Sequence, residues 1–317
     1  MTDSPAPSAS APVIRAEGLE KTFRDFWKRP KVRAVRGIGF EVRPGEVFGL
    51  LGPNGSGKST TIKMILGLLH PTAGSLSVLG QPPRDVAVKR RLGYLPEESY
   101  LYPYLTAEET LHFYGKLFDL SPPDRRTRVD QLLDMVGLTQ ARHRHVGEFS
   151  KGMARRIGLA QALINDPDLV ILDEPTSGLD PLGSRQVKDV ILALARRGKT
   201  VLVSSHLLAD MEDVCDRIAI LFNGQIQATG PIGSLLEQSD QIQIRFPRPA
   251  EDRLAAVLAE LKRAAGGDPE VRQPRMNLEQ FFLDTVARAR ESATEVSGAA
   301  PDGKLARFLE HTAKEPE

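Results

Sequence analysis

The sequence predicts an α/β fold built on a mainly parallel sheet, because three short apolar runs have the length of buried strands. These runs are VFGLL from Val47, DLVILDE from Asp168 and KTVLVSSH from Lys199. Alternating residues in AVRGIGFEV and the turn Asn223-Gly224 additionally predict antiparallel hairpins. We therefore expect a parallel core accompanied by antiparallel strands.

The composition is that of a globular protein with balanced charge. The chain has 317 residues, with 42 basic and 41 acidic side chains, and 41% of its residues are apolar. This length suits a main domain with an appendage, and the charge balance gives no overall field that would recruit nucleic acid or anionic lipid. No apolar run approaches the roughly 18 residues of a membrane span. Cys215 is the single cysteine, which excludes an internal disulfide. Its side chain is expected to be buried and to pack in the core, with no reactive role.

The order of these patterns suggests how the chain is divided. Thr106 and Glu109 have the spacing of a capping box and begin a mainly helical stretch. After Gly230 we expect a strand from Gln241 and helices from Glu251 and Asn277, and KLARFLEH near the end could form a short helix. The expected parts are a disordered tail at 1–12, a main domain at 13–230 with a helical subdomain at about 104–165, a C-terminal α+β extension at 231–290 and a loose tail at 291–317.

The segment GPNGSGKST, Gly52 to Thr60, fits the phosphate-binding loop pattern G-x-x-x-x-G-K-[ST] without a mismatch. Its glycines let consecutive backbone N–H groups point inward at a polyphosphate, and the helix that follows adds its positive end. We expect Lys58 to reach the β- and γ-phosphates and Ser59 to bind Mg²⁺. The nucleotide-binding residues predicted in this loop are Asn54, Gly55, Ser56, Gly57, Lys58, Ser59 and Thr60.

Ionisable side chains follow two of the predicted parallel strands. Asp173 and Glu174 end one run and His206 ends another. Because ligands collect at the carboxyl ends of parallel strands, these side chains are expected to converge on the phosphate loop. Asp173 can hold Mg²⁺, usually through water, and Glu174 is placed to act as a general base on the attacking water. His206 either positions that water and the γ-phosphate or merely caps the next helix.

Together these motifs resemble the nucleotide-binding subunit of an ATP-binding cassette (ABC) transporter over about residues 13–230. The resemblance rests on an ordered series: GPNGSGKST, FSKGM followed by ARRIGLAQAL, LVILDEP, SGLDP and His206. It implies the ABC ATPase type of P-loop NTPase fold, with an antiparallel β subdomain, a helical subdomain and a small C-terminal α+β extension. The chain is most similar to the single-domain ATPases of type-2 export systems, which pair with a separate membrane permease.

The resemblance also implies that two chains share each ATP site. FSKGM corresponds to the family signature, in which Ser150 and Gly152 keep the usual pattern whereas Lys151 and Met153 depart from it. Ser150 caps a helix whose positive end favours an anion, by resemblance the ATP of the other subunit. SGLD, with Asp180, would link the two sites across the dimer axis.

Two further positions have alternative interpretations. In LGYLPEES the family usually has a glutamine where this chain has Glu97, which either contacts the metal and γ-phosphate or is a solvated glutamate. For adenine the resemblance points to Phe23, although Phe26 and Trp27 compete for that role. The basic segment 24–33 around these two aromatics is expected to be a solvated loop, or else to touch lipid headgroups or a partner.

The motifs imply ATP and Mg²⁺ as cofactors and an ATP hydrolase at the cytoplasmic face of the cell membrane. Its partners would be a transmembrane permease and a second ATPase subunit, either an identical copy or a paralogue. The alternative is a soluble ABC ATPase that acts on nucleic acid or the ribosome. Chromosome-type members need a long coiled coil between loop and signature, but Lys58 and Ser150 are only 92 positions apart. A small-molecule kinase would need neither FSKGM nor SGLDP, and we expect no nucleic-acid partner.

Overall fold

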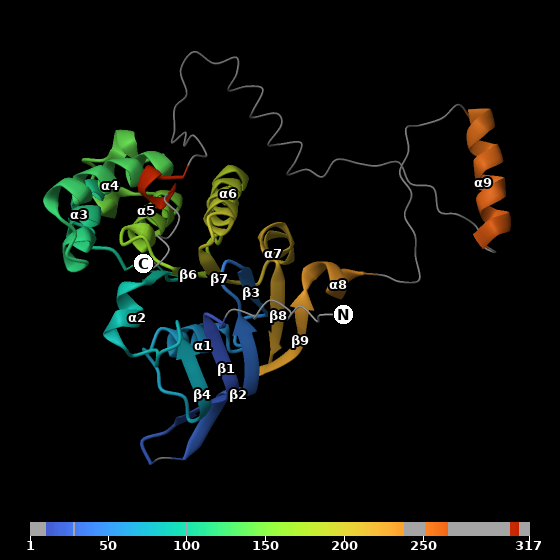
Figure 1. Ribbon diagram of the computed structural model, residues 1–317, viewed down its shortest axis with the longest axis horizontal. Helices are drawn as coiled ribbons and strands as arrows, with labels where there is room; N and C mark the ends of the chain where they lie inside the picture. The colour runs from blue at the N-terminus through green and yellow to red at the C-terminus, as the bar shows by residue number, and fades with distance from the viewer. Residues whose placement is uncertain (1–10, 28, 99, 238–250, 266–304, 311–317) are drawn as a thin grey trace, which may run out of the picture. The chain divides into compact units, whose positions relative to one another are not determined.

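The computed structural model describes residues 11–27, 29–98, 100–237, 251–265 and 305–310 (Figure 1). The chain divides into two compact units, Met1–Leu235 with Glu295–Glu317, and Leu236–Thr294. In the second unit, α9 (Glu251–Ala265) confirms the helix expected from Glu251. The strand expected from Gln241 and the helix expected from Asn277 lie outside the described residues, as do residues 1–10 of the expected tail.

The larger sheet of the first unit has six strands in the order β5-β6-β7-β3-β8-β9. The first five strands in this order, from β5 through β3 to β8, pair in parallel. The last, β9, is an edge strand that pairs antiparallel with β8. The turn that joins β8 to β9, Asn223-Gly224, has φ values of 49° and 76°, as a two-residue type I′ hairpin requires. The strand bounds are β3 (Val47–Leu51), β5 (Leu92–Leu95), β6 (Leu169–Asp173), β7 (Thr200–Ser205), β8 (Arg217–Phe222) and β9 (Gln225–Pro231). The three predicted parallel strands are therefore neighbours, which confirms the α/β fold class.

Several helices of the first unit begin at side chains that satisfy otherwise unpaired backbone N–H groups. Thr106 and Glu109 form the expected capping box, and Ser121, Ser150 and Asp180 each cap the helix that follows. The bounds are α1 (Lys58–Ile65), α2 (Val86–Arg90), α3 (Ala107–Leu117), α4 (Pro122–Met135), α5 (Lys151–Leu163), α6 (Pro181–Arg196), α7 (Leu208–Val214) and α8 (Ile232–Leu236). Within the described ranges, no helix combines the length and apolar character that crossing a membrane requires.

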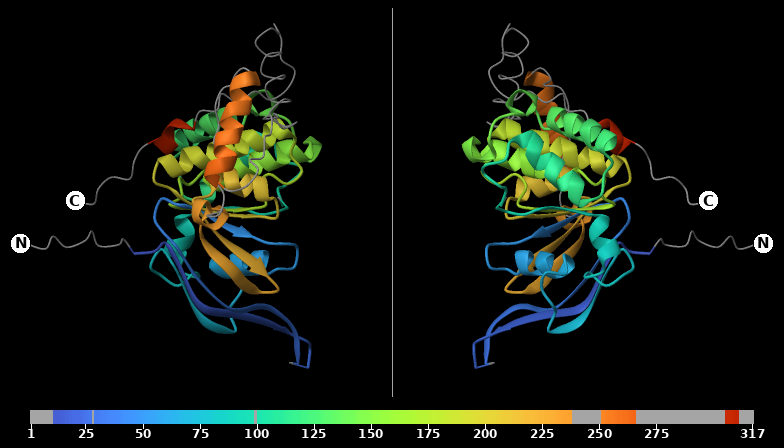
Figure 2. Two further views of the ribbon diagram at one scale, coloured as in Figure 1. Left: turned by 90° about the vertical axis from the view of Figure 1, so that its right-hand side faces the viewer. Right: turned by 90° about the vertical axis from the view of Figure 1, so that its left-hand side faces the viewer.

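A smaller antiparallel sheet has the order β2-β1-β4, formed by β1 (Ile14–Arg24), β2 (Pro30–Val42) and β4 (Ala73–Val78). Strand β4 pairs with β1 only as far as Glu20, whereas β1 and β2 remain paired out to Arg24 and Pro30. Beyond Glu20 the two strands therefore continue as a ribbon of their own. Figure 2 shows this ribbon projecting on the side opposite helices α3 to α6.

Side-chain alternation along the strands divides the core into two clusters. Val47 and Leu51 of β3 belong to a cluster with helices α3 to α7. Phe48 and Leu50 of the same strand belong to a second cluster, with α1 and the smaller sheet. Because successive strand residues point to opposite faces, the six-stranded sheet is covered on both sides. The carboxyl ends of β3, β6 and β7 are thereby held next to one another at one edge of the core.

Near the end of the chain, the residues of KLARFLEH pack on the first unit. Leu305, Ala306 and Leu309 are 7%, 3% and 0% exposed and join the cluster that contains α3 to α7. Arg307–Glu310 form a 3-10 helix, so the short helix allowed by the sequence exists. The expectation of a loose tail is wrong for these residues, because their apolar side chains have a partner surface.

Polar contacts also hold this C-terminal segment. The backbone N–H of Phe308 donates to Oε1 of Gln131 in α4 at 2.9 Å, and the guanidinium of Arg128 lies 4.6 Å from the Phe308 ring centroid. On the other side, Arg197 after α6 donates to the carbonyl oxygen of Leu309 at 3.4 Å. The segment thus connects the helical part of the unit to a helix beside the sheet.

We expect Leu309→Ala to lower the free energy of unfolding by about 2 kcal/mol, because it removes a fully buried side chain and leaves a cavity. Urea unfolding followed by circular dichroism measures the change. Arg307→Ala, an exposed position in the same segment, is the matched control and should change stability by less than about 0.5 kcal/mol. Equal, small effects of the two substitutions would show that this segment contributes no packing energy.

Candidate nucleotide-binding site

The phosphate loop leaves the carboxyl end of β3 and enters α1 through left-handed glycines. Gly55 and Gly57 have φ values of 80° and 108°, which side chains with a Cβ rarely adopt. A Cβ on Gly57 would lie 2.7 Å from the carbonyl oxygen of Ala34, and one on Gly52 would lie 2.3 Å from that of Leu221. Close backbone approach therefore requires glycine at both positions.

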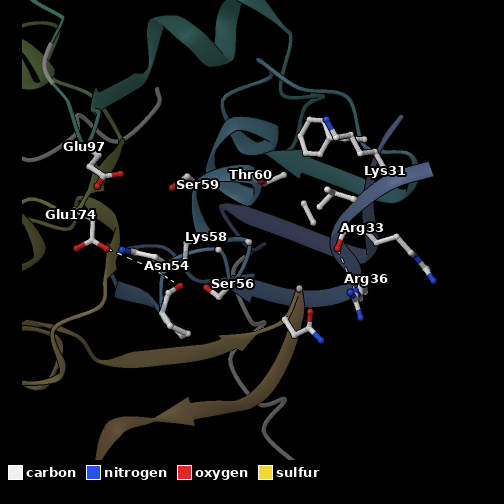
Figure 3. A pocket seen from close by; sticks show the side chains of 18 residues that line it. Lys31, Arg33, Arg36, Asn54, Ser56, Lys58, Ser59, Thr60, Glu97 and Glu174 are labelled. Atoms are coloured by element: carbon white, nitrogen blue, oxygen red, sulfur yellow. Dashed lines mark hydrogen bonds and ion pairs between the residues drawn. The ribbon is translucent and has the colours of Figure 1, made fainter. Parts of the chain in front are cut away.

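Lys58 is buried and lies between this loop and Glu174. Its Nζ donates to the carbonyl oxygen of Gly52 at 2.6 Å and to that of Pro53 at 3.4 Å. The same nitrogen is 3.6 Å from Oε1 of Glu174, and Figure 3 shows the two side chains pointing toward one another. The loop thus fixes the ammonium group at the place where the polyphosphate was expected.

A cavity of about 580 Å³ opens over the loop, a volume typical of small-molecule sites. Phe23 of β1 lines it, whereas Phe26 and Trp27 do not, so the register of the β1-β2 ribbon selects Phe23 among the three aromatics. Glu97 also lines it. The predicted residues found in its wall are Phe23, Asn54, Gly55, Ser56, Gly57, Lys58, Ser59, Thr60, Glu97 and Glu174.

Asp173 lies at the carboxyl end of β6, where it is 3% exposed. Its carboxylate accepts a hydrogen bond from the hydroxyl of Ser204 in β7. Burial raises the pKa of Asp173, and this hydrogen bond opposes the rise. A hard cation would also favour the ionised carboxylate, and the hydroxyl of Ser59 in the first turn of α1 supplies a second oxygen donor of the type that Mg²⁺ prefers.

Glu174 turns away from the direction of the strand. Its φ is 52°, in the left-handed region that non-glycine residues rarely adopt, and its backbone N–H donates to the carbonyl oxygen and the hydroxyl of Ser204 at 3.0 and 3.2 Å. The turn brings Oε2 of Glu174 to 2.8 Å from Nδ1 of His206. The two carboxylate oxygens therefore face different partners, Lys58 and His206.

Ser150, Gly152 and Asp180 are not among the described residues that line the cavity of their own chain. Ser150 caps α5, where its Oγ accepts from the N–H of Met153 at 3.2 Å. Asp180 caps α6, where its carboxylate accepts from the N–H of Gly183 at 2.9 Å. Within one chain both side chains stabilise helix starts.

Arg155 is a residue of this site that our sequence analysis did not single out. It is 4% exposed, and burial lowers its pKa to about 10, so it remains charged at neutral pH. Its guanidinium donates to five main-chain carbonyl oxygens, those of Pro96, Glu97, Asp173, Glu174 and Pro175. The available signal was its place four residues before Leu159, on the face that α5 buries.

The parallel sheet, the phosphate loop and the acidic turn define a P-loop ATPase. In agreement, residues 35–177 match the family model described as ABC transporter. The chain is 43% identical over 258 residues to an uncharacterized ABC transporter ATP-binding protein of Synechocystis sp., covering 80% of this chain and 73% of the relative. It is 38% identical over 301 residues to the Nod factor export ATP-binding protein I of Burkholderia lata, covering 87% and 97%. The chain belongs to the family of ABC transporter ATP-binding subunits.

Solved structures lead to the same family. The ATP-binding subunit of an ABC transporter superposes with a TM-score of 0.63 and 32% identity, covering 70% of this chain and 91% of that chain. A dimeric ATP-binding cassette in a post-hydrolysis state, bound to ADP and Pi, superposes with a TM-score of 0.64 and 25% identity, covering 69% and 98%. The chain is therefore an ATP-hydrolysing cassette, which confirms the predicted family and enzyme class.

We expect Asp173→Asn to abolish Mg²⁺-dependent ATP hydrolysis and to raise the free energy of unfolding by roughly 1 kcal/mol at neutral pH. A buried acid with a raised pKa binds protons more readily in the folded chain, so its ionised form costs stability. The amide oxygen of asparagine can still accept from Ser204. Phosphate release measures hydrolysis, and urea unfolding without Mg²⁺ measures stability.

The pH dependence of that stability difference has a definite sign. As pH falls through the raised pKa of Asp173, the folded chain takes up a proton and regains stability, whereas the substituted chain does not titrate at this position. The advantage of Asp173→Asn should therefore shrink toward acid pH. Asp168→Asn, at a partly exposed residue paired with Arg91, is the control and should change stability little. If the higher free energy of unfolding of Asp173→Asn persisted undiminished at acid pH, burial of the ionised Asp173 carboxylate would not be its cause.

Proposed function

We propose that this ATPase subunit drives a separate transmembrane permease from the cytoplasmic face of the cell membrane, and that the transport is export. The arrangement of Lys58, Glu174 and His206 at the phosphate loop is the observation that supports ATP hydrolysis as the energy source for transport. The Nod factor export proteins among the relatives, such as that of Burkholderia lata, support the direction. Membrane fractionation with a co-purifying hydrophobic subunit tests the partner, and ATPase activity stimulated by nucleic acid would favour the soluble alternative.

ATP binding requires groups for the base, the phosphates and a divalent cation. Phe23, Gly55 and Gly57 line the cavity; in the proposed complex Phe23 stacks on adenine and the N–H groups of the loop bind the phosphates. Ser59 and Asp173 would hold Mg²⁺, which neutralises charge on the β- and γ-phosphates when it is bound. All of these side chains come from elements anchored in the two core clusters, so the site is largely preformed.

Hydrolysis requires a water positioned in line with the γ-phosphate. The carboxylate of Glu174 acts as the general base in this proposal, since the backbone turn fixes its direction while Lys58 and His206 hold one oxygen each. Lys58 stabilises the negative charge that develops on the transferred phosphoryl group. Glu97 lines the cavity wall, where it either senses the γ-phosphate or its metal or remains a solvated glutamate.

The second half of each pocket comes from another subunit, an identical copy or a paralogue. Ser150 is exposed at the start of α5 and lies outside the cavity of its own chain. In the proposed dimer, Ser150 and Gly152 contact the γ-phosphate held by Lys58 of the opposite chain, and Asp180 lies between the sites. The dimeric cassette of similar fold supports this arrangement.

We expect Glu174→Gln to bind ATP and to accumulate as a closed dimer, with hydrolysis reduced by about 10² to 10⁴-fold, because glutamine cannot accept the proton of the water. Light scattering with ATP measures the dimer, and phosphate release measures turnover. Glu98→Gln, at an exposed glutamate bonded to Tyr100, is the matched control and should behave like the unmodified chain. Near-normal hydrolysis by Glu174→Gln would remove this residue from the mechanism.

We expect Lys58→Ala and Ser150→Ala chains to be inactive alone and to regain turnover when they are mixed. In a mixed dimer one pocket combines both defects, while the other combines the intact loop of one chain with the intact signature of its partner. Random pairing of equal amounts places half of the dimers in this state, so measurable activity should return. Absence of any recovery, when mixed dimers are detected by differential tags, would rule out shared pockets.

A further inference from the structure

The tip of the β1-β2 ribbon exposes two aromatic side chains. Phe26 is 92% exposed and Trp27 is 71% exposed, and their rings meet edge to face with centroids 5.8 Å apart. The tip turns through a backbone hydrogen bond from Asp25 to Arg29, and neither ring lines the nucleotide cavity. The sequence alone left open a solvated loop or a contact with lipid headgroups or a partner. Two adjacent, exposed rings form a surface suited to contact another phase or molecule.

Positive charge is concentrated around these rings. The chain as a whole has a formal net charge of +1. In the stretch 21–33, however, the only acidic residue is Asp25, and the basic residues are Lys21, Arg24, Lys28, Arg29, Lys31 and Arg33. Asp25 is already paired with Arg29 at 3.0 Å. Lys31 and Arg33 line the nucleotide cavity, and Arg33 also lies 3.5 Å from Glu20. The excess positive charge beside the two rings therefore comes from the basic residues of the stretch 24–29.

The guanidinium of Arg29 lies 5.1 Å from the Trp27 ring centroid. This contact keeps a charge directly beside the most apolar surface of the tip. A dry protein pocket that received Trp27 would have to desolvate Arg29 as well, at considerable cost. The headgroup layer of a bilayer accepts both together, because aromatic rings partition to that depth while phosphates solvate the cation.

We propose that the ribbon tip, residues 24–29, is a membrane-contact element that inserts Phe26 and Trp27 at the headgroup level of an anionic lipid surface. The projection of the ribbon beyond the smaller sheet leaves its tip free of neighbouring elements of the same unit (Figure 2). Basic side chains next to apolar rings give the combination of electrostatic and apolar attraction by which peripheral proteins bind membranes. This contact needs no permease, so its test is independent of the proposed transport partner.

Trp27 is the only tryptophan of the chain, so its fluorescence reports on the tip alone. We expect the full chain to show a blue shift of emission with vesicles of phosphatidylcholine and phosphatidylglycerol, and quenching when the lipids carry bromine near the headgroups. Vesicles of phosphatidylcholine alone should give a much weaker response, and added salt should reduce binding to the anionic vesicles.

Co-sedimentation with the same vesicles measures the partition coefficient of each variant. The double change Phe26→Ala with Trp27→Ala should lower it roughly tenfold, because both buried apolar groups are lost. Arg24→Gln should lower it about fivefold, the effect of one basic residue near an anionic surface. Tyr104→Ala removes an equally exposed aromatic outside the ribbon and should bind like the unmodified chain.

The double variant should keep its thermal unfolding midpoint, since Phe26 and Trp27 are both largely exposed, and this keeps a loss of binding interpretable. The proposal is overturned if Trp27 emission does not respond to anionic vesicles, or responds equally to neutral ones. It is also overturned if the double variant binds vesicles normally but no longer co-purifies with a membrane subunit, because the tip would then be a protein contact.

Discussion

The buried guanidinium of Arg155 is the interaction on which the geometry of the catalytic region depends. It bonds carbonyl oxygens of the Glu97 segment and of the turn at Glu174, while its own helix, α5, begins at Ser150. Multiple hydrogen bonds from one planar cation fix both distance and direction. The segment predicted to reach a neighbouring ATP is therefore held rigidly to Glu174, the general base proposed for its own site. In the proposed dimer, this single ion connects the two pockets through the interior of each subunit.

Several features of the site oppose folding and are held in place by the surrounding core. The left-handed turn at Glu174 costs on the order of 1 to 3 kcal/mol, and the buried carboxylate of Asp173 has a raised pKa. The neighbouring strand compensates, since Ser204 bonds both the Asp173 carboxylate and the Glu174 backbone. Both strands, β6 and β7, are fully buried between the two apolar clusters. The unfavourable turn and the buried carboxylate are therefore attached to the most stable part of the sheet.

Local sequence rules predicted the strands, the helix caps and the phosphate loop, because each depends on neighbouring residues. Outcomes that depend on long-range packing were not predictable in the same way. The choice of Phe23 over Phe26 and Trp27 follows from strand register, and the burial of Leu309 follows from a surface formed by distant helices. Arg155 was missed for a related reason, since its acceptors are backbone atoms that no sequence motif identifies.

The positions of two helix starts support the proposal that a second chain completes each site. The start of α1 lies in the wall of the cavity, whereas Ser150 at the start of α5 is exposed and outside it. A capping side chain satisfies only part of the unpaired N–H groups of a first helical turn, and the remainder favour an anion. Two such helix starts can stabilise one triphosphate from opposite sides only if they belong to different chains. If the proposed partner is an identical copy, two-fold symmetry makes the two pockets equivalent, so closure of one contact surface assembles both.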